Sequence, residues 1–312
     1  MMEPVPVVTN AYAPRETIEL CGRMGVAKAN TRIDKVFVSS VLAGVLLSFA
    51  GAVLLTVNAS PWFKGDAPGM LKIVGGLLFP IGFVMVVTSG TDLCTGSFVI
   101  TTLAVLQRRI SVWKMLLHWF ITFRGNLAGS LFVVAIIAGY GGVFLEQSAK
   151  DAVYKFNSSK VVTPEWHMIF LGAIGCNWLV SMACFFAYMA REYISKVVAI
   201  WWPIFAFVAL GLDHVVANML LIPMSIWLDD PNVTVNLYIW KSVIPALMGN
   251  IIGGVIVAVS YWHLHLIGEG PVPIDGSYFT LEERRLVESV TIERAPSETS
   301  EEKEKRSPEA MV

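Results

Sequence analysis

The chain has 312 residues, of which 55% are hydrophobic and only 15% are charged, and its formal net charge is −1 at pH 7. Soluble domains usually carry about a quarter charged residues, so this composition excludes an ordinary soluble protein. The balanced charge and the lack of a basic cluster give no reason to expect a nucleic-acid partner. The four cysteines show no CxxC spacing, and we expect no disulfide, metal or cofactor.

Long apolar stretches predict six membrane-spanning helices, because one span needs about 20 apolar residues. They cover approximately residues 36–58, 73–106, 114–144, 165–190, 196–227 and 240–266. The second and the fifth are too long for one unbroken span, so each is expected to consist of two half-helices. The sequence therefore predicts an all-α membrane protein. Its pore domain, residues 36–267, lies between a polar N-terminal segment, 1–35, and a charged and mostly disordered tail, 268–312.

Three short motifs occur twice, at separations of 123, 121 and 124 residues. These are an aromatic-proline pair, a Gly-x-Asp triplet and a Gly-Asn-x-x-Gly motif, which begin at Phe79 and Trp202, Gly90 and Gly211, and Gly125 and Gly249. Matching separations predict a repeat of three spans plus three spans, inverted in the membrane, with broken helices in spans two and five. Corresponding breaks in two halves of an apolar chain are typical of a transport site.

Each break is expected near Gly90 or Gly211, beside an aspartate. Backbone groups inside a membrane need partners, so the two breaks must be surrounded by protein or line a wet cavity. If the breaks face each other, two helix N-termini converge and favour an anion between them. Asp92 and Asp213 are expected to cap these half-helices, and direct coordination of a cation is the competing interpretation.

Several polar side chains lie in the middle of predicted spans. His214 is the only histidine placed there, and ionisable groups in membranes usually mark ion or proton pathways. The alternative is a neutral histidine that is hydrogen-bonded in the bundle without a further role. Asn126, Asn177 and Asn250 lie midway along spans three, four and six, where amides are expected to brace the broken loops.

Arg124 lies about ten residues into span three. Its side chain either extends to the membrane interface or neutralises an aspartate of the broken loops. Phe79, Phe83 and Phe207 precede the breaks, and each is either a core residue or part of a dry constriction in a pore.

Lysines and arginines flank the second-to-third and fourth-to-fifth connections, and others precede span one. The positive-inside rule then predicts that both termini are cytoplasmic, and the long polar tails favour the plasma membrane. Lysines on the opposite side, Lys160 among them, either solvate loops or attract anions to a pore mouth.

Three segments resemble the formate/nitrite transporter family. Residues 88–96 (TSGTDLCTG) are similar to its first signature, 176–180 (CNWLV) to its second, and 212–219 (LDHVVANM) to its histidine-bearing loop. The resemblance implies an aquaporin-like fold, a separate pore in each subunit of a homopentamer, and small monovalent anions as substrates. The pore residues that it implies are His214 with Thr95 as its partner, the constrictions at Phe79, Phe83, Leu93 and Phe207, the vestibule lysine Lys160, and the bracing amides Asn177 and Asn250.

The sequence is therefore interpreted as a carrier of a small anion, nitrite first and formate next, which crosses with a proton or as the neutral acid. An aquaporin-like channel for neutral solutes is the alternative, although Asn-Pro-Ala repeats are absent. A membrane-embedded enzyme is not expected, because one histidine in the middle of the membrane has no nucleophile or metal-ligand partner. The expected partners are the anion, protons, membrane lipid and further copies of the chain.

Overall fold

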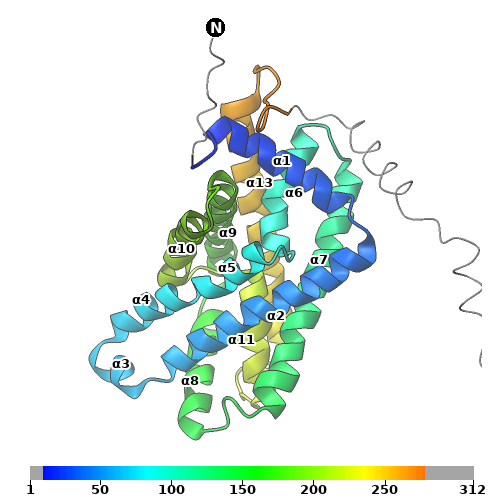
Figure 1. The fold of residues 1–312 in the computed structure, drawn as a ribbon. Coiled ribbons are helices and arrows are strands. Elements are labelled where there is room, and N and C mark those ends of the chain that lie inside the picture. The colour runs from blue at the N-terminus through cyan, green and yellow to red at the C-terminus, as the bar shows by residue number, and fades with distance from the viewer. Residues whose placement is uncertain (1–9, 278–312) are drawn as a thin grey trace, which may run out of the picture. The chain divides into compact units, whose positions relative to one another are not determined.

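A computed structural model describes residues 10–277, and the structural statements below concern these residues. It divides into one unit that ends at Gly270 and a second that starts at Pro271, which are treated separately. The first unit is a bundle of helices (Figure 1). Most of the predicted tail, 268–312, lies outside the described residues.

Six helical segments are long and apolar enough to cross a membrane, which confirms the predicted number of spans. Span one is α2 (Ile33–Asn58), span two is α4 (Pro68–Leu78) with α5 (Pro80–Thr88), and span three is α7 (Val112–Phe132) with the π-helix η1 (Val133–Tyr140). Span four is α9 (Trp166–Met189), and span five is α10 (Tyr193–Leu210). Span six joins α12 (Val235–Tyr238), the π-helix η3 (Ile239–Val243) and α13 (Ile244–Leu266).

Short apolar helices follow spans two and five, as expected for broken helices. They are α6 (Cys94–Leu106) and α11 (Val215–Trp227). Each half of the chain therefore contains a long span, a broken span and another long span. Each half contains three spans, which is an odd number, so the second half starts on the opposite side of the membrane from the first. The repeat is therefore inverted.

The two aromatic-proline pairs differ in their effect. Pro80 starts α5, so a short interruption at Phe79 separates α4 from α5, but Phe79 keeps helical dihedral angles and Pro68–Thr88 forms a single span. Span two thus consists of this segment and α6 on the two sides of the Gly90 break, as predicted. Pro203 lies inside α10, which continues through it. Proline fits the first turn of a helix without loss, whereas inside a helix it removes one hydrogen bond.

The remaining helices are amphipathic or short connections. They are α1 (Pro14–Ala29), α3 (Pro61–Asp66), α8 (Gln147–Asn157) and the π-helix η2 (Ser158–Val162). Helix α1 falls in the segment predicted only as polar. Its face with Ile18, Cys21 and Val26 is buried, and the helix packs on α6, α9 and α13.

The repeated Gly-Asn-x-x-Gly motif brings two pairs of spans together. A Cβ atom on Gly125 or Gly129 of α7 would collide with the backbone of α2, and one on Gly249 or Gly253 of α13 would collide with the backbone of α9. Small residues allow such close approach of helices in membranes. The asparagine of each motif is thereby held against the broken span of its own half.

Candidate functional site

The two broken spans have the same backbone course. Gly90 and Gly211 adopt left-handed conformations, with φ of 72° and 76°, which a residue with a side chain rarely adopts. The chain turns at these glycines, and a new helix starts at Cys94 in the first half and at Val215 in the second. The breaks therefore fall where the repeated Gly-x-Asp triplet predicts them.

Asn126 and Asn250 hold the two loops by equivalent hydrogen bonds. The Asn126 side chain accepts from the Cys94 backbone N–H at 2.9 Å and donates to the carbonyls of Asp92 at 3.0 Å and Ser40 at 2.8 Å. The Asn250 side chain accepts from the Val215 N–H at 2.9 Å and donates to Asp213 at 3.0 Å and Ala173 at 2.8 Å. Each amide thus joins a loop, the helix that follows it and a neighbouring span.

The expectation that Asp92 and Asp213 cap the half-helices is wrong. The first N–H of each helix bonds to an asparagine instead, and both carboxylates turn to other side chains. Asp92 Oδ1 accepts from Lys28 Nζ at 2.8 Å and from Ser97 Oγ at 2.6 Å, and its Oδ2 lies 3.0 Å from His118 Nε2. Asp213 has a weaker contact, 3.4 Å, with Lys160 Nζ. Because a lysine lies beside each of the two carboxylates, neither requires a bound cation.

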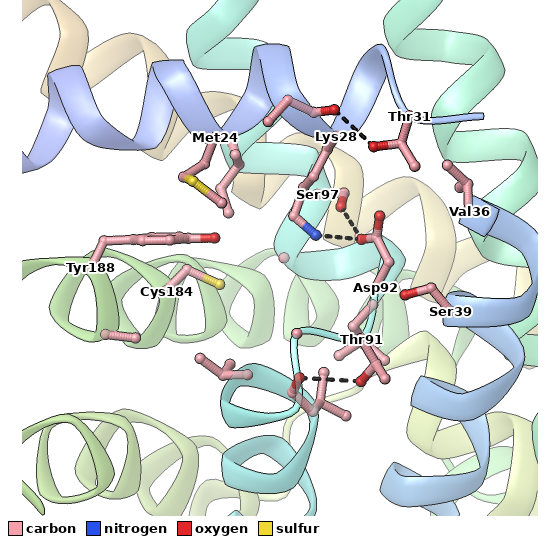
Figure 2. A pocket seen from close by; sticks show the side chains of 18 of the residues that line it. Met24, Lys28, Thr31, Val36, Ser39, Thr91, Asp92, Ser97, Cys184 and Tyr188 are labelled. Carbon is pink, nitrogen blue, oxygen red and sulfur yellow. Dashed lines mark hydrogen bonds and ion pairs between the residues drawn. The ribbon is translucent and has the colours of Figure 1, made fainter. Parts of the chain in front are cut away.

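The first cavity, of about 360 Å³, lies against the first loop. Figure 2 shows the Lys28 side chain, from α1, and Ser97, from α6, meeting at Asp92. Phe83 and Leu93 also line this cavity, and both are buried in the protein. Helix α1 therefore supplies a cation to one face of the broken span.

The second cavity, of about 520 Å³, lies against the second loop. Lys160 enters it from η2 and donates to the carbonyls of Gly211 at 2.6 Å and Leu212 at 3.1 Å. His214, Phe79 and Phe207 line the same cavity. Each half of the chain thus places a lysine beside the aspartate of its own loop.

His214 and Thr95 connect the two broken spans. His214 Nε2 lies 2.9 Å from the Thr95 hydroxyl oxygen, while its Nδ1 accepts from the Ala217 backbone N–H at 3.1 Å. An acceptor at Nδ1 assigns the neutral tautomer with hydrogen on Nε2, so the imidazole donates to Thr95. The starts of α6 and α11, with their partial positive charges, therefore meet at this hydrogen bond.

Two aromatic rings cover the His214 side of this hydrogen bond. The Phe207 ring stacks on the His214 ring with centroids 5.8 Å apart, and Phe79 meets Phe207 edge-on at the same separation. The implied constriction residues thus form two groups: Phe79 and Phe207 on the second cavity, and Phe83 and Leu93 on the first.

Asn177 lies behind Thr95. Its side-chain nitrogen donates to the carbonyls of Thr95 at 3.3 Å and Asn250 at 2.6 Å. Its buried oxygen has no hydrogen-bond partner among the described residues.

Sequence reasoning missed three side chains of the site: Lys28, Ser97 and His118. The repeat contained a signal for Lys28, because Lys28 precedes α2 by five residues and Lys160 precedes α9 by six. Of the two interpretations left open for Arg124, neutralisation of a loop aspartate does not occur within the described residues, where Asp92 and Asp213 have other partners. Within the described residues, no group of three or more histidine, cysteine or acidic side chains is arranged to hold a metal ion.

An inverted repeat with two broken spans that meet between cavities defines a membrane transport protein. The family model described as "Formate/nitrite transporter" matches residues 15–263, and the chain belongs to this family. The probable formate transporter of Methanothermobacter thermautotrophicus is 35% identical over 268 residues, which are 81% of this chain and 97% of that protein. The formate channel FocA of Escherichia coli (strain K12) is 29% identical over 276 residues, covering 81% and 94% of the two chains.

Two solved structures are similar in fold. The chain matches a structure described as an FNT family ion channel with a TM-score of 0.71 and 27% identity, over 80% of this chain and 98% of that one. It also matches a pentameric formate channel with formate bound, with a TM-score of 0.65 and 27% identity, over 75% and 98% of the respective chains.

Proposed function

We propose that this chain transports a small monovalent anion, which crosses together with a proton, along a path past Thr95 and His214. The observation that carries the proposal is the hydrogen bond between these residues, at the meeting of two helix N-termini and between two cavities that each contain a lysine. Names of the matched relatives and structures support an anion as substrate.

Energetics favour passage of a neutral acid. Moving a small bare ion out of water into a medium of low dielectric costs on the order of 20 kcal/mol in the idealised limit. Protonating a carboxylic acid with a pKa of about 3.5 at pH 7 costs roughly 5 kcal/mol, because each pKa unit corresponds to about 1.4 kcal/mol. The converging helix N-termini and Lys160 would raise anion occupancy, and the neutral acid would then pass the apolar constrictions.

Water in the cavities is the proton source that the His214 geometry favours. The Nδ1 atom of His214 already accepts from Ala217, so an additional proton there would break that bond and place a charge at the positive end of α11. His214 therefore acts as a fixed neutral donor to Thr95. The Thr95 hydroxyl hydrogen is then free to bind an oxygen of the passing substrate.

Formate and nitrite are the proposed substrates, and preference for nitrite remains a prediction from the sequence. Both are small, planar anions of weak acids, which suits a path closed by Phe79, Phe83, Leu93 and Phe207. Competition of several unlabelled weak acids with labelled nitrite would order them. Osmotic swelling of liposomes tests the alternative of an aquaporin-like solute channel.

We further propose a homopentamer in the plasma membrane, with both termini cytoplasmic. The similar structure of a pentameric formate channel supports the assembly. The arginines and lysines near α1 and the α6–α7 connection support the orientation. In this orientation the first cavity, with Lys28, opens toward the cytoplasm, and the second, with Lys160, opens outward. Residues 1–35 and 268–312 are proposed as cytoplasmic segments on either side of the 36–267 pore domain.

Uptake of labelled nitrite and formate into proteoliposomes tests the proposal. Uptake is expected to rise as the external pH falls from 8 to 5, and to be largely lost in His214→Ala. Reconstituted amounts must match, and Thr56→Ala, an exposed position on α2 that lines neither cavity, serves as the control variant. Equal uptake at both pH values, with His214→Ala as active as the unmodified chain, would overturn it.

A further inference from the structure

The first broken loop leaves backbone carbonyls without donors. Within the described residues, no hydrogen bond reaches the carbonyl oxygens of Ser89, Gly90 or Thr91. Ser89 and Gly90 are exposed on the outside of the unit. Irregular backbone at membrane depth is tolerated only where protein or a wet cavity covers it. Gly90 and Thr91 also line the first cavity, where water can reach their carbonyls, whereas Ser89 lines only the outer hollow. The Ser89 carbonyl is therefore the group that needs a donor on the outer side of this loop.

The second loop has a lysine that donates to its backbone carbonyls, and the first loop has no such donor among the described residues. By the repeat, Gly90 corresponds to Gly211 and Thr91 to Leu212, and the carbonyls of Gly211 and Leu212 accept from Lys160. The equivalent lysine of the first half, Lys28, is turned to the Asp92 carboxylate instead. One half thus supplies a cation to its own loop carbonyls, whereas the other half does not.

A shallow hollow on the outer surface leads to these carbonyls. Its lining includes Ser89, Gly90 and Thr91 from the loop, Val38 from α2, and the carboxylate-bearing Asp34. Asp34 is exposed, and among the described residues its ion pair is with its neighbour Arg32. Lys35 lines the hollow too, so its acceptors, the loop carbonyls and the Asp34 carboxylate, lie beside one lysine. A guanidinium from outside could bond several of these acceptors at once.

Arg124 has the complementary properties. It is exposed on α7, about 18 Å from the start of the helix at Val112. Its guanidinium lies over the Phe120 ring at 4.1 Å, and no hydrogen bond or ion pair of Arg124 occurs within the described residues. An arginine within a membrane-spanning helix normally pairs with another polar group. The equivalent position in the second half, Met248, is apolar, so the repeat itself does not require a charge here.

Arg124 does not fill the hollow of its own copy. The α7 backbone beside it, at Gly125, packs on Phe37 and Ser40 of α2, whereas the hollow lies along Val38 and Ser39 of the same helix. The donor and the acceptors are thus on different sides of α2. When two complementary surfaces, here Arg124 and the hollow, lie at different places on one chain, they join copies head to tail. Such contacts can close into a ring.

We propose that Arg124 of one copy enters the hollow of the next copy and donates to the carbonyls of its first broken loop. The inference rests on the proposed homo-oligomer. A neighbouring copy would then support the loop that carries Asp92 and Leu93, so the site of each protomer is completed by the next. The guanidinium suits this role, because its five N–H donors can bond several carbonyls and the Asp34 carboxylate together.

Cross-linking between differently tagged copies tests this contact. One tagged copy carries Arg124→Cys and the other carries Ser89→Cys, and membranes that contain both are treated with a short bis-maleimide. The expected result is a covalent dimer that carries both tags. The four native cysteines are buried. The matched control replaces Arg124→Cys with Met248→Cys, the exposed equivalent in the second half, and is expected to give no such dimer.

Native mass spectrometry of Arg124→Leu and Arg124→Lys provides the second measurement. Arg124→Leu is expected to shift the protein toward single copies, and Arg124→Lys to retain more of the assembly. An intact assembly without the mixed-tag dimer, or equal cross-linking in the Met248→Cys control, overturns the contact. So does an Arg124→Leu assembly that stays intact and loses only bound anionic lipid. Single copies in the unmodified protein would instead refute the homo-oligomer.

Discussion

His214 Nε2 and the Thr95 hydroxyl oxygen lie 2.9 Å apart, so the first turn of α6 is hydrogen-bonded to the residue that precedes α11. The two residues are 119 positions apart in the chain and belong to different repeats. Their contact holds the broken spans together at the point where both helices begin. Any substrate that passes between the cavities would meet this pair.

Replacing Thr95 separates the role of its hydroxyl from that of its shape. Thr95→Val keeps the volume but removes the hydroxyl proposed to bind an oxygen of the passing substrate, and a hydrogen bond to a charged group contributes about 1.5–3 kcal/mol. Initial uptake of labelled formate is expected to fall about tenfold or more in this variant, since 1.4 kcal/mol corresponds to tenfold. Thr95→Ser retains the hydroxyl and should keep most of the uptake. Equal rates in the two variants would contradict the proposed role.

Asn126→Ala and Asn250→Ala should destabilise the protein by similar amounts. Each removes the partner of one buried N–H and two buried carbonyls, and an unsatisfied buried group costs about 1–3 kcal/mol. Thermal unfolding in detergent is expected to show a clear fall in the midpoint for both. Asn58→Ala, which removes a single bond to the Leu54 carbonyl near the end of α2, is the control. A large loss for only one of the two loop variants would refute their equivalence.

Lys28→Met should be more damaging to stability than Lys160→Met. Removing Lys28 leaves the buried Asp92 carboxylate without its closest cation, and breaking a buried pair typically costs about 3–5 kcal/mol. Lys160 is 3.4 Å from Asp213 and mainly donates to neutral carbonyls. Unfolding midpoints of both variants test the order. Adding Asp92→Asn to Lys28→Met should recover part of the loss, because the unpaired charge is then absent.

Glu192 caps the start of α10 outside the membrane and gives the stability a defined pH dependence. Its carboxylate accepts from the backbone N–H groups of Ile194 at 2.8 Å and Ser195 at 2.7 Å, and these bonds lower its pKa below the usual value. A carboxyl with a lowered pKa in the folded state stabilises the protein above its unfolded pKa of about 4.3. This contribution is lost as the pH falls through the folded pKa.

Glu192→Gln is therefore expected to unfold at a lower temperature than the unmodified chain at pH 7, with the difference shrinking below about pH 4. Glu165→Gln is the matched control, because Glu165 precedes α9 without a side-chain capping bond. A difference that widens on acidification would contradict the capping argument.

The repeated Gly-x-Asp motif was enough to predict where the helices break. It is a local signal, because a left-handed backbone conformation favours glycine at that position. The partners of Asp92 could not be obtained in this way. Lys28 and His118 lie on α1 and α7, and the sequence does not state how those helices are rotated toward the loop.

The capping prediction failed for a related reason. An aspartate before a helix is a common cap, but the first N–H of α6 is taken by Asn126, which is 32 residues away from Cys94. Once a distant amide satisfies that donor, the aspartate is free to pair with a cation. Only the packing of α7 against the broken span decides between these arrangements.

Duplication placed Leu93 and His214 at matching positions, each as the residue immediately before a short helix. Leu93 has a hydrocarbon side chain, whereas His214 has an imidazole that donates a hydrogen bond. A substrate that moves in one direction would meet the His214 imidazole before the Leu93 side chain. A substrate that moves in the other direction would meet them in the opposite order. This pair of positions therefore makes the two sides of the meeting point chemically different, although the backbone of the two loops follows the same course.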